Sequence, residues 1–167
     1  YGATHLLQTL PTGSDVSWGV WPADSANSIS VRTDAANPTQ VTSPLHYIMA
    51  TPALSSDLSN ITGKFWYNDL YLYSGESSLG EVTGLTIGMD IDFLSGEIKN
   101  GCLNLDIDLG STMFYWDTHF YGVTNGSEIQ TTVIGSSPLA SNVGIPMFFT
   151  GTSDPAIAGS YRLEEEG

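Results

Sequence analysis

The sequence predicts an all-β fold, a soluble antiparallel up-and-down β-barrel of about eight strands. Three observations predict it. Apolar residues recur at every second position over long stretches, which indicates strands with one face on a core and the other in water. Turn dipeptides such as Asn125-Gly126 separate these stretches by hairpin-length links. Next to no segment has a helical pattern.

The chain before residue 85 contains the less regular elements. Residues 1–14 are expected to be a lead-in, in which Leu6, Leu7 and Leu10 form one helical turn before Pro11. Residues 16–21 and 46–50 are predicted strands. The polar segment 23–44 between them is predicted to be a long loop with a weak strand candidate at Ile29–Arg32. Residues 61–73 predict one long aromatic strand, bent near Asn68-Asp69.

The clearest alternation lies between residues 85 and 109. Its apolar positions form two runs, Leu85, Ile87, Met89, Ile91 and Phe93, then Leu103, Leu105, Ile107 and Leu109. The link Phe93-Leu94-Ser95-Gly96 contains a Ser-Gly turn signal, so the two runs predict a β-hairpin.

The details of this hairpin are also predictable. A tight turn pairs Phe93 with Ile98 and places Asp92 opposite Lys99 as a cross-strand ion pair. The inward-facing residues are odd-numbered up to Phe93, even-numbered at Ile98 and odd-numbered again from Leu103. The second change predicts a β-bulge at Gly101-Cys102.

The remaining strands follow in chain order. Residues 112–121 form the most aromatic one, after a turn at Gly110-Ser111. Strands are predicted at 128–134, 145–151 and 157–163, with a loop at 138–142 and an acidic, frayed tail at 164–167. Residues 15–163 are therefore expected to form a single barrel domain.

Composition limits the function. The chain has 167 residues, with 18 acidic against 4 basic side chains and a formal net charge of −14. Nucleic acids and anionic membrane surfaces repel such a surface, so neither is an expected partner. No stretch approaches the roughly 20 apolar residues of a membrane helix. The acidic, lysine-poor composition suits an extracellular setting, and we expect a signal peptide outside this chain and a larger parent protein.

Metal and thiol chemistry have weak signals. Cys102 is the only cysteine, which excludes an internal disulfide and predicts a buried, inert thiol. Four hairpin aspartates, Asp90, Asp92, Asp106 and Asp108, alternate on the polar side and are a weak calcium candidate. Strand pairing separates them, so a solvated face is the simpler interpretation. No cofactor is expected.

Catalytic signals are equally weak. Asp117 and His119 lie two positions apart on one strand face, where the carboxylate can orient a general base. The chain has no Gly-x-Ser-x-Gly motif, and any acidic barrel offers pairs of carboxylates by chance. We therefore expect no catalytic residue.

Aromatic residues are the stronger functional signal. Consecutive aromatics in the 61–73 and 112–121 strands must point to both faces of the sheet. One face fills the core, and the other exposes large rings or is covered by the 23–44 loop. The predicted binding residues are Trp66, Tyr67, Trp116 and Tyr121.

Several motifs resemble one family over residues 15–163. They are Trp18-Gly19-x-Trp21, Leu45-His46-Tyr47 before Thr51-Pro52, Gly63-Lys64-Phe65-Trp66-Tyr67, the 85–93 strand, Phe148-Phe149-x-Gly151 and Gly159-Ser160-Tyr161-Arg162-Leu163. The chain resembles the C-terminal domain of bacterial cell-envelope proteins that have an N-terminal FecR domain. The closing hairpin is similar to that of barrels from surface lipoproteins that bind transferrin. The resemblance implies a small exported barrel and no particular catalytic residue.

The function that we expect is a non-catalytic binding or interaction module of an exported bacterial cell-envelope protein. Its location is the periplasm, the outer-membrane surface or the extracellular space, and its partner is a protein or a glycan at the cell surface. Two alternatives stay open. One is a hydrolase acting on a glycan, and the other is a barrel that holds a small apolar ligand in its interior.

Overall fold

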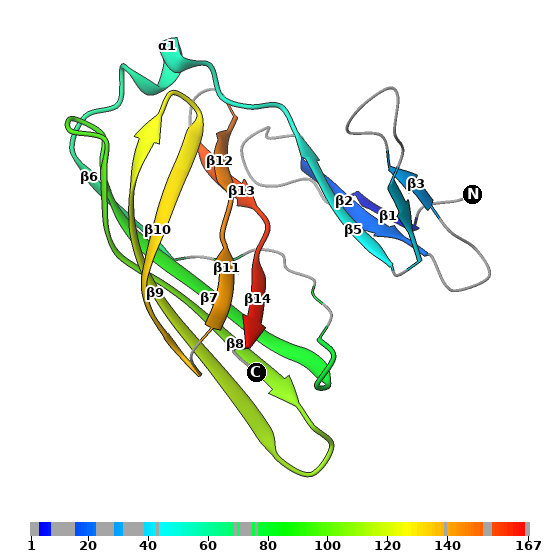
Figure 1. The fold of residues 1–167 in the computed structure, drawn as a ribbon. Helices are drawn as coiled ribbons and strands as arrows, with labels where there is room; N and C mark the ends of the chain where they lie inside the picture. Colours follow the sequence, from blue (N-terminus) through cyan, green and yellow to red (C-terminus); the bar gives the residue numbers. More distant parts are fainter. Residues whose placement is uncertain are drawn as a thin grey trace.

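The main body of the protein is one curled antiparallel sheet. A computed structural model describes residues 4–7, 16–22, 29–31, 39–42, 44–68, 70, 75, 77–138, 140–151 and 155–165. Seven strands lie in the order β13-β12-β10-β9-β8-β7-β6 and curl around the core as a half-barrel (Figure 1). They are β6 (Lys64–Tyr67), β7 (Glu81–Asp92), β8 (Glu97–Asp108), β9 (Met113–Asn125), β10 (Glu128–Ser137), β12 (Met147–Thr150) and β13 (Ala156–Gly159).

Three smaller sheets complete the described structure. The first has the order β1-β2-β5, and the pairs β3–β4 and β11–β14 form the other two. Their strands are β1 (Thr4–Leu7), β2 (Val16–Trp21), β3 (Ile29–Val31), β4 (Thr39–Val41), β5 (Leu45–Ala50), β11 (Ala140–Gly144) and β14 (Arg162–Glu165). One helical turn, α1 (Ser55–Leu58), follows β5, and none of the described helical residues form a helix long and apolar enough to cross a membrane.

The predicted all-β, antiparallel, up-and-down architecture is confirmed, because β6 to β10 are neighbours in chain order. The sheet has the form of a half-barrel, with β6 and β13 as its two edges. Val143 of β11 and Leu163 of β14 pack against the core, so the β11–β14 pair covers part of the concave side.

Several local predictions are wrong. Leu6 and Leu7 lie in a strand and not in a helical turn. Residues 140–142 of the predicted 138–142 loop belong to β11. The predicted 157–163 strand divides between β13 and β14, and β14 includes two residues of the predicted tail. Short strands of this kind depend on a distant partner for their hydrogen bonds, and local sequence does not reveal that partner.

The two long segments before the hairpin also differ from expectation. The 23–44 segment contains the β3–β4 pair, which confirms the weak strand candidate over Ile29–Val31. Of the predicted 61–73 strand, β6 spans Lys64–Tyr67 only. Residues 69 and 71–73 of that prediction lie outside the described part of the chain. So do residues 1–3 and 8–14 of the predicted lead-in and the last two residues of the predicted tail.

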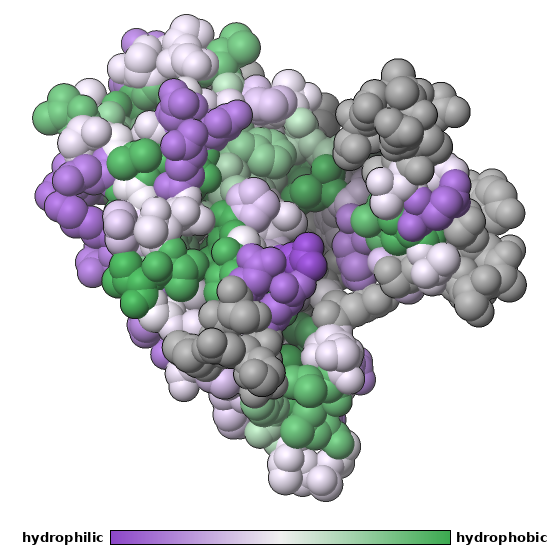
Figure 2. Space-filling view, viewed as in Figure 1, coloured by the Kyte–Doolittle hydropathy of each residue, from purple (hydrophilic) through white to green (hydrophobic). Residues whose placement is uncertain are grey.

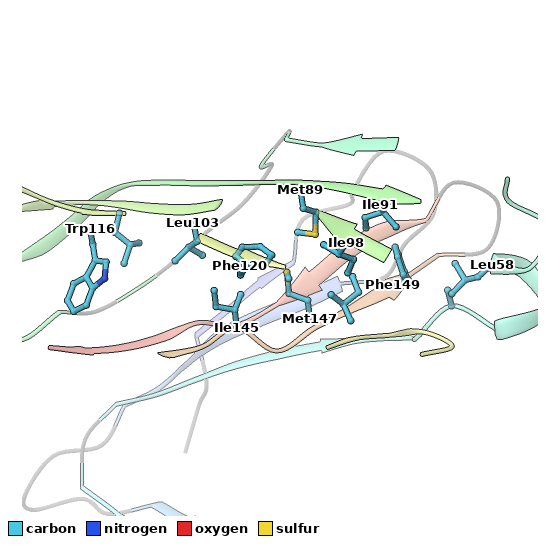
Figure 3. Packing of buried hydrophobic residues seen from close by; sticks show 13 residues of the cluster. Leu58, Met89, Ile91, Ile98, Leu103, Trp116, Phe120, Ile145, Met147 and Phe149 are labelled. Atoms are coloured by element: carbon cyan, nitrogen blue, oxygen red, sulfur yellow. The ribbon is translucent and has the colours of Figure 1, made fainter. Parts of the chain in front are cut away.

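The core fills the concave side of the sheet. Met89, Ile91, Ile98, Leu103 and Phe120 point inward from β7, β8 and β9 toward Met147 and Phe149 of β12 (Figure 3). Phe149 is fully buried, and its ring lies 5.4 Å from that of Phe93 and 6.4 Å from that of Tyr67. Burial of this much apolar surface is the main favourable term in folding.

The predicted central hairpin is confirmed, but its register differs. Ile91, and not Phe93, pairs with Ile98, so Asp90 lies opposite Lys99 and Asp92 lies opposite Glu97. Asp92 Oδ1 accepts the backbone N–H of Leu94 at 3.0 Å and that of Ser95 at 3.4 Å, within a turn that ends at Gly96. The carboxylate that was expected to pair with Lys99 therefore stabilises the turn instead.

The predicted bulge is present one residue earlier than expected. The pairing of β8 with β9 shifts between Ile98 and Gly101, and Asn100 has a φ of 51°. Lys99 and Asn100 are both exposed, whereas Gly101 is buried. A Cβ at Gly101 would lie 2.4 Å from the ring of Phe120, so the inward position after the bulge must be a glycine.

The smaller β1-β2-β5 sheet is joined to the main sheet by short backbone contacts. Ala53 N–H donates to the carbonyl of Phe149 at 2.8 Å, and Thr150 Oγ1 donates to the carbonyl of Thr51 at 2.8 Å. The chain that leaves β5 therefore pairs with the end of β12 before it reaches α1. Figure 1 shows the smaller sheet to one side of the half-barrel, connected by this segment.

Phe149→Ala tests the core. We expect the free energy of unfolding to fall by about 3–5 kcal/mol, because the truncation leaves a cavity that several elements line. Urea denaturation followed by circular dichroism measures the change. Leu94→Ala is the control, because Leu94 is 84% exposed in the β7–β8 turn, and we expect a change within about 0.5 kcal/mol. An equal loss of unfolding free energy in Phe149→Ala and Leu94→Ala would contradict this description of the core.

Candidate binding face on the main sheet

Two of the four predicted binding residues pack inward: Trp116 is buried and Tyr67 is half-buried. Trp116 is only 5% exposed and its Nε1–H donates to Ser136 Oγ at 2.7 Å, so it belongs to the core. Tyr67 is half-buried, packs against the core and donates from its hydroxyl to the carbonyl of Pro155 at 3.3 Å. Neither ring belongs to an exposed aromatic surface on the outer face, as the prediction supposed, and a binding role for them stays a prediction. Both have the strand parity that faces inward.

The other two predicted residues, Trp66 and Tyr121, are each 49% exposed. They lie on the outer face of the main sheet, the side away from the core. Trp66 pairs with Asp90, and Asp90 pairs with Lys99. In the β8–β9 pairing, Ile98 pairs with Gly122 and Gly101 with Phe120. The two bulge residues, Lys99 and Asn100, therefore lie opposite Tyr121. One row of side chains thus crosses four strands, a span of roughly 14 Å.

A glycine lets the Trp66 ring lie against the sheet. A Cβ built on Gly88 would lie 3.0 Å from Cζ2 and 3.1 Å from Cη2 of Trp66, closer than ordinary contacts. It would also lie 3.4 Å from Cys102 Sγ on the neighbouring strand. The indole of Trp66 therefore occupies the space that a side chain at position 88 would take, and it rests on the backbone of β7.

Beside this row the outer face has a polar hollow of about 230 Å³, whose lining includes neither Trp66 nor Tyr121. Its lining residues are Lys64, Asp90, Asp92, Glu97, Lys99 and Asn100. We call these six residues together with Trp66 and Tyr121 the outer-face site. Sequence reasoning missed Lys64, Glu97, Lys99 and Asn100 as members. The Asn100-Gly101 dipeptide inside a strand pattern was the available signal, since it marks a bulge that re-aims side chains.

The polar groups of the hollow bond to one another. Asn100 Nδ2 donates to Asp90 Oδ2 at 2.7 Å, which orients that carboxylate. Lys64 Nζ lies 3.8 Å from Asp92 Oδ2, and Lys99 Nζ lies 2.9 Å from Glu97 Oε2. The hydrogen bond to Glu97, then the charges of Glu97 and Asp92, raise the pKa of Lys99. The two ammonium groups and the Asn100 amide donate hydrogen bonds, and the carboxylates accept them, so the hollow presents both donors and acceptors.

The Asp117–His119 pair forms but is open to water. His119 Nε2 lies 3.3 Å from Asp117 Oδ2, and both side chains are more than half exposed, at 58% and 52%. In the amide orientation that satisfies both of its ends, Asn104 donates to Asp117 Oδ1 at 2.7 Å. Water competes for each of these bonds, so the pair lacks the desolvation that tunes a general base. The glycan hydrolase alternative stays a prediction.

The four aspartates of the calcium candidate do not gather. Asp106 pairs with Gly84 and Asp108 with Glu81, at the opposite end of the hairpin from Asp90 and Asp92. Among the residues that the structure describes, no group of three His, Cys, Asp or Glu side chains is placed to hold a metal ion. The separation predicted from strand pairing is confirmed. Cys102, predicted to be buried, is only half-buried beside the Trp66 ring.

A second hollow, of about 510 Å³, lies at one end of the concave side. Its apolar lining comes from Val82, Leu105, Ile107, Trp116 and Leu163, and its polar lining includes Ser77, Ser78, Arg162 and Glu164. Arg162 Nε donates to Glu164 Oε1 at 2.8 Å, and this bond, followed by one from Asn142, lowers the pKa of Glu164. The middle of the concave side is filled by Phe120 and Phe149.

A stacked aromatic pair and a pair of exposed apolar residues near the β8–β9 turn lie outside these two hollows. Trp21 and Tyr47 stack in the β1-β2-β5 sheet with ring centroids 4.5 Å apart. Leu109 and Met113 are exposed near the β8–β9 turn, where Figure 2 shows a hydrophobic area at the lower end of the molecule. Neither feature includes a residue of the predicted binding set.

Comparison of the chain with protein-family models, with curated proteins and with solved structures finds no match. The resemblance to FecR-associated envelope domains, and the export that it implies, therefore stay predictions.

Gly88→Val tests the support of Trp66. We expect the added methyl groups to displace the indole and to lower the free energy of unfolding by about 1–3 kcal/mol. Fluorine NMR of protein labelled with fluorotryptophan measures the displacement, with the Trp66 resonance assigned from Trp66→Phe. Gly135→Val is the control, because no atom lies within 4 Å of a Cβ built there. An unmoved Trp66 resonance in Gly88→Val would contradict the contact.

Proposed function

We propose that this chain is a non-catalytic binding module of an exported bacterial cell-envelope protein and that its partner docks on the outer-face site. The observation that supports this proposal best is a row across four strands that has a half-exposed aromatic ring at each end and runs beside a polar hollow. Large exposed rings are enriched where proteins bind partners, because each offers apolar area at a low entropy cost. The long strands below them supply a rigid support.

Charge supports the extracellular setting of the proposal. The net charge of −14 keeps the chain soluble and repels nucleic acids and anionic lipids. The proposed partner is a protein or a glycan at the cell surface, encountered in the periplasm, at the outer membrane or outside the cell. The resemblance to FecR-associated domains agrees with the same setting.

Sedimentation with isolated bacterial outer membranes tests the proposed face. Trp66→Ala and Tyr121→Ala should each weaken binding of the labelled protein at least tenfold, about 1.4 kcal/mol. Tyr115→Ala is the matched control: Tyr115 is 65% exposed on the same strand as Tyr121, but lies roughly 20 Å along it. We expect no change for this variant. Binding that survives both Trp66→Ala and Tyr121→Ala would reject the proposed face.

The second hollow favours one alternative function, the binding of a small apolar ligand inside the half-barrel. Its volume of about 510 Å³ is within the range of small-molecule sites, and apolar walls with a few polar groups are typical of them. Leu105, Ile107 and Trp116 supply buried apolar surface, and the ion pair of Arg162 with Glu164 offers polar contacts.

The uncharged dye N-phenylnaphthylamine tests this alternative. We expect its fluorescence to rise on binding and Ile107→Phe to weaken the binding roughly tenfold, because the larger ring occupies the hollow. Circular dichroism checks that the variant is folded. Trp66→Ala, on the opposite face of the sheet, should bind the dye like the wild type. No fluorescence gain with the folded wild-type protein would reject a ligand in this hollow.

A further inference from the structure

The order in which aromatic and polar side chains follow one another across the outer-face site distinguishes between classes of partner. Along the row that crosses β6 to β9, the charged and amide groups of Asp90, Lys99 and Asn100 lie in the centre, and the rings of Trp66 and Tyr121 lie at the two ends. Stable protein–protein interfaces have the reverse order, an apolar centre depleted of charge within a polar rim. A protein partner would bury five charged side chains at the centre of its contact, namely Lys64, Asp90, Asp92, Glu97 and Lys99. That burial is costly unless each is paired again.

We propose that the ligand of the outer-face site is a neutral oligosaccharide that crosses β6 to β9, and this inference rests on the proposed function. Trp66 and Tyr121 contact the apolar C–H faces of sugar rings at the two ends. The polar groups of Asp90, Lys99 and Asn100, which lie between the two rings in the row and line the hollow, bind the hydroxyl groups of the intervening sugar. The span of roughly 14 Å corresponds to a short oligosaccharide and not to a single sugar.

The groups in the hollow match vicinal hydroxyls. A carboxylate accepts hydrogen bonds through two oxygens, an ammonium donates them, and the Asn100 amide does both. Asn100 donates to Asp90 at 2.7 Å, and the backbone N–H groups of the turn donate to Asp92 at 3.0 Å and 3.4 Å, so both acceptors are oriented before the ligand arrives. Preorganisation of this kind reduces the entropy lost on binding.

Charge selects a neutral glycan over an anionic one. The hollow has three carboxylates, Asp90, Asp92 and Glu97, and two ammonium groups that already contact carboxylates. Sulfated, phosphorylated or uronic-acid-rich chains would meet net repulsion here and from the overall charge of −14.

A glycan array that includes neutral bacterial and plant oligosaccharides, sialylated glycans and sulfated glycosaminoglycans tests the inference with the full chain. We expect binding to neutral members, with affinities then measured by calorimetry. Trp66→Ala and Tyr121→Ala should lose at least tenfold in affinity, whereas Trp66→Phe retains most of it and Tyr115→Ala all of it. Asn100→Gly keeps the positive φ but removes the amide, and we expect a loss of several-fold.

The outcomes separate the inference from the proposed function. Binding to sulfated or sialylated members only would overturn the charge argument. The absence of any glycan binding, with outer-membrane binding still sensitive to Trp66→Ala, would overturn the oligosaccharide and leave the binding module with a protein partner. Neutral-glycan binding that is unaffected by Trp66→Ala and Tyr121→Ala would place the sugar elsewhere and overturn the inference.

Discussion

The close approach of Gly101 to Phe120 is the constraint on which both the fold and the outer-face site depend. A side chain at position 101 would overlap the Phe120 ring, which is 1% exposed at the centre of the core. Glycine at position 101 avoids this overlap. The bulge just before it, with Asn100 in the left-handed region, turns position 101 toward the core. Because the bulge adds a residue, both Lys99 and Asn100 turn outward, and together they line the hollow beside Tyr121. Packing inside the sheet thus shapes the surface outside it.

Asp92 connects the hairpin turn with the same surface. One of its oxygens accepts two backbone N–H groups of the turn, and the other faces Lys64 on β6. The turn therefore determines where a carboxylate of the hollow lies. Gly88 of β7 positions another group of the site, because the absence of a side chain there leaves room for the Trp66 ring. Small backbone features of β7 and β8 position most of the polar and aromatic groups of the site.

The aromatic residues show how far strand parity can be predicted. Aromatics in β6 and β9 occupy both parities, and the sequence does not say which parity meets the core. Trp116 shares its parity with Phe120 and is buried, whereas Tyr121, one position further, is half exposed. The predicted binding set therefore contained two residues of the outer face and two that pack inward, because the inward side is set by partners distant in sequence, such as Phe149 for Tyr67 and Ser136 for Trp116.

The sequence by itself determined the fold class, the central hairpin and its neighbouring turns. These features depend on local alternation and on turn residues such as Gly96 and Gly126, whose φ angles of 74° and 60° favour glycine. Only the tertiary structure decided the register of Ile91 with Ile98, the pairing of β11 with β14, and the placement of Trp66 above Gly88. The reason is physical: register, distant strand pairing and exposure are set by which surfaces meet during folding, and residues far apart in the chain supply those surfaces.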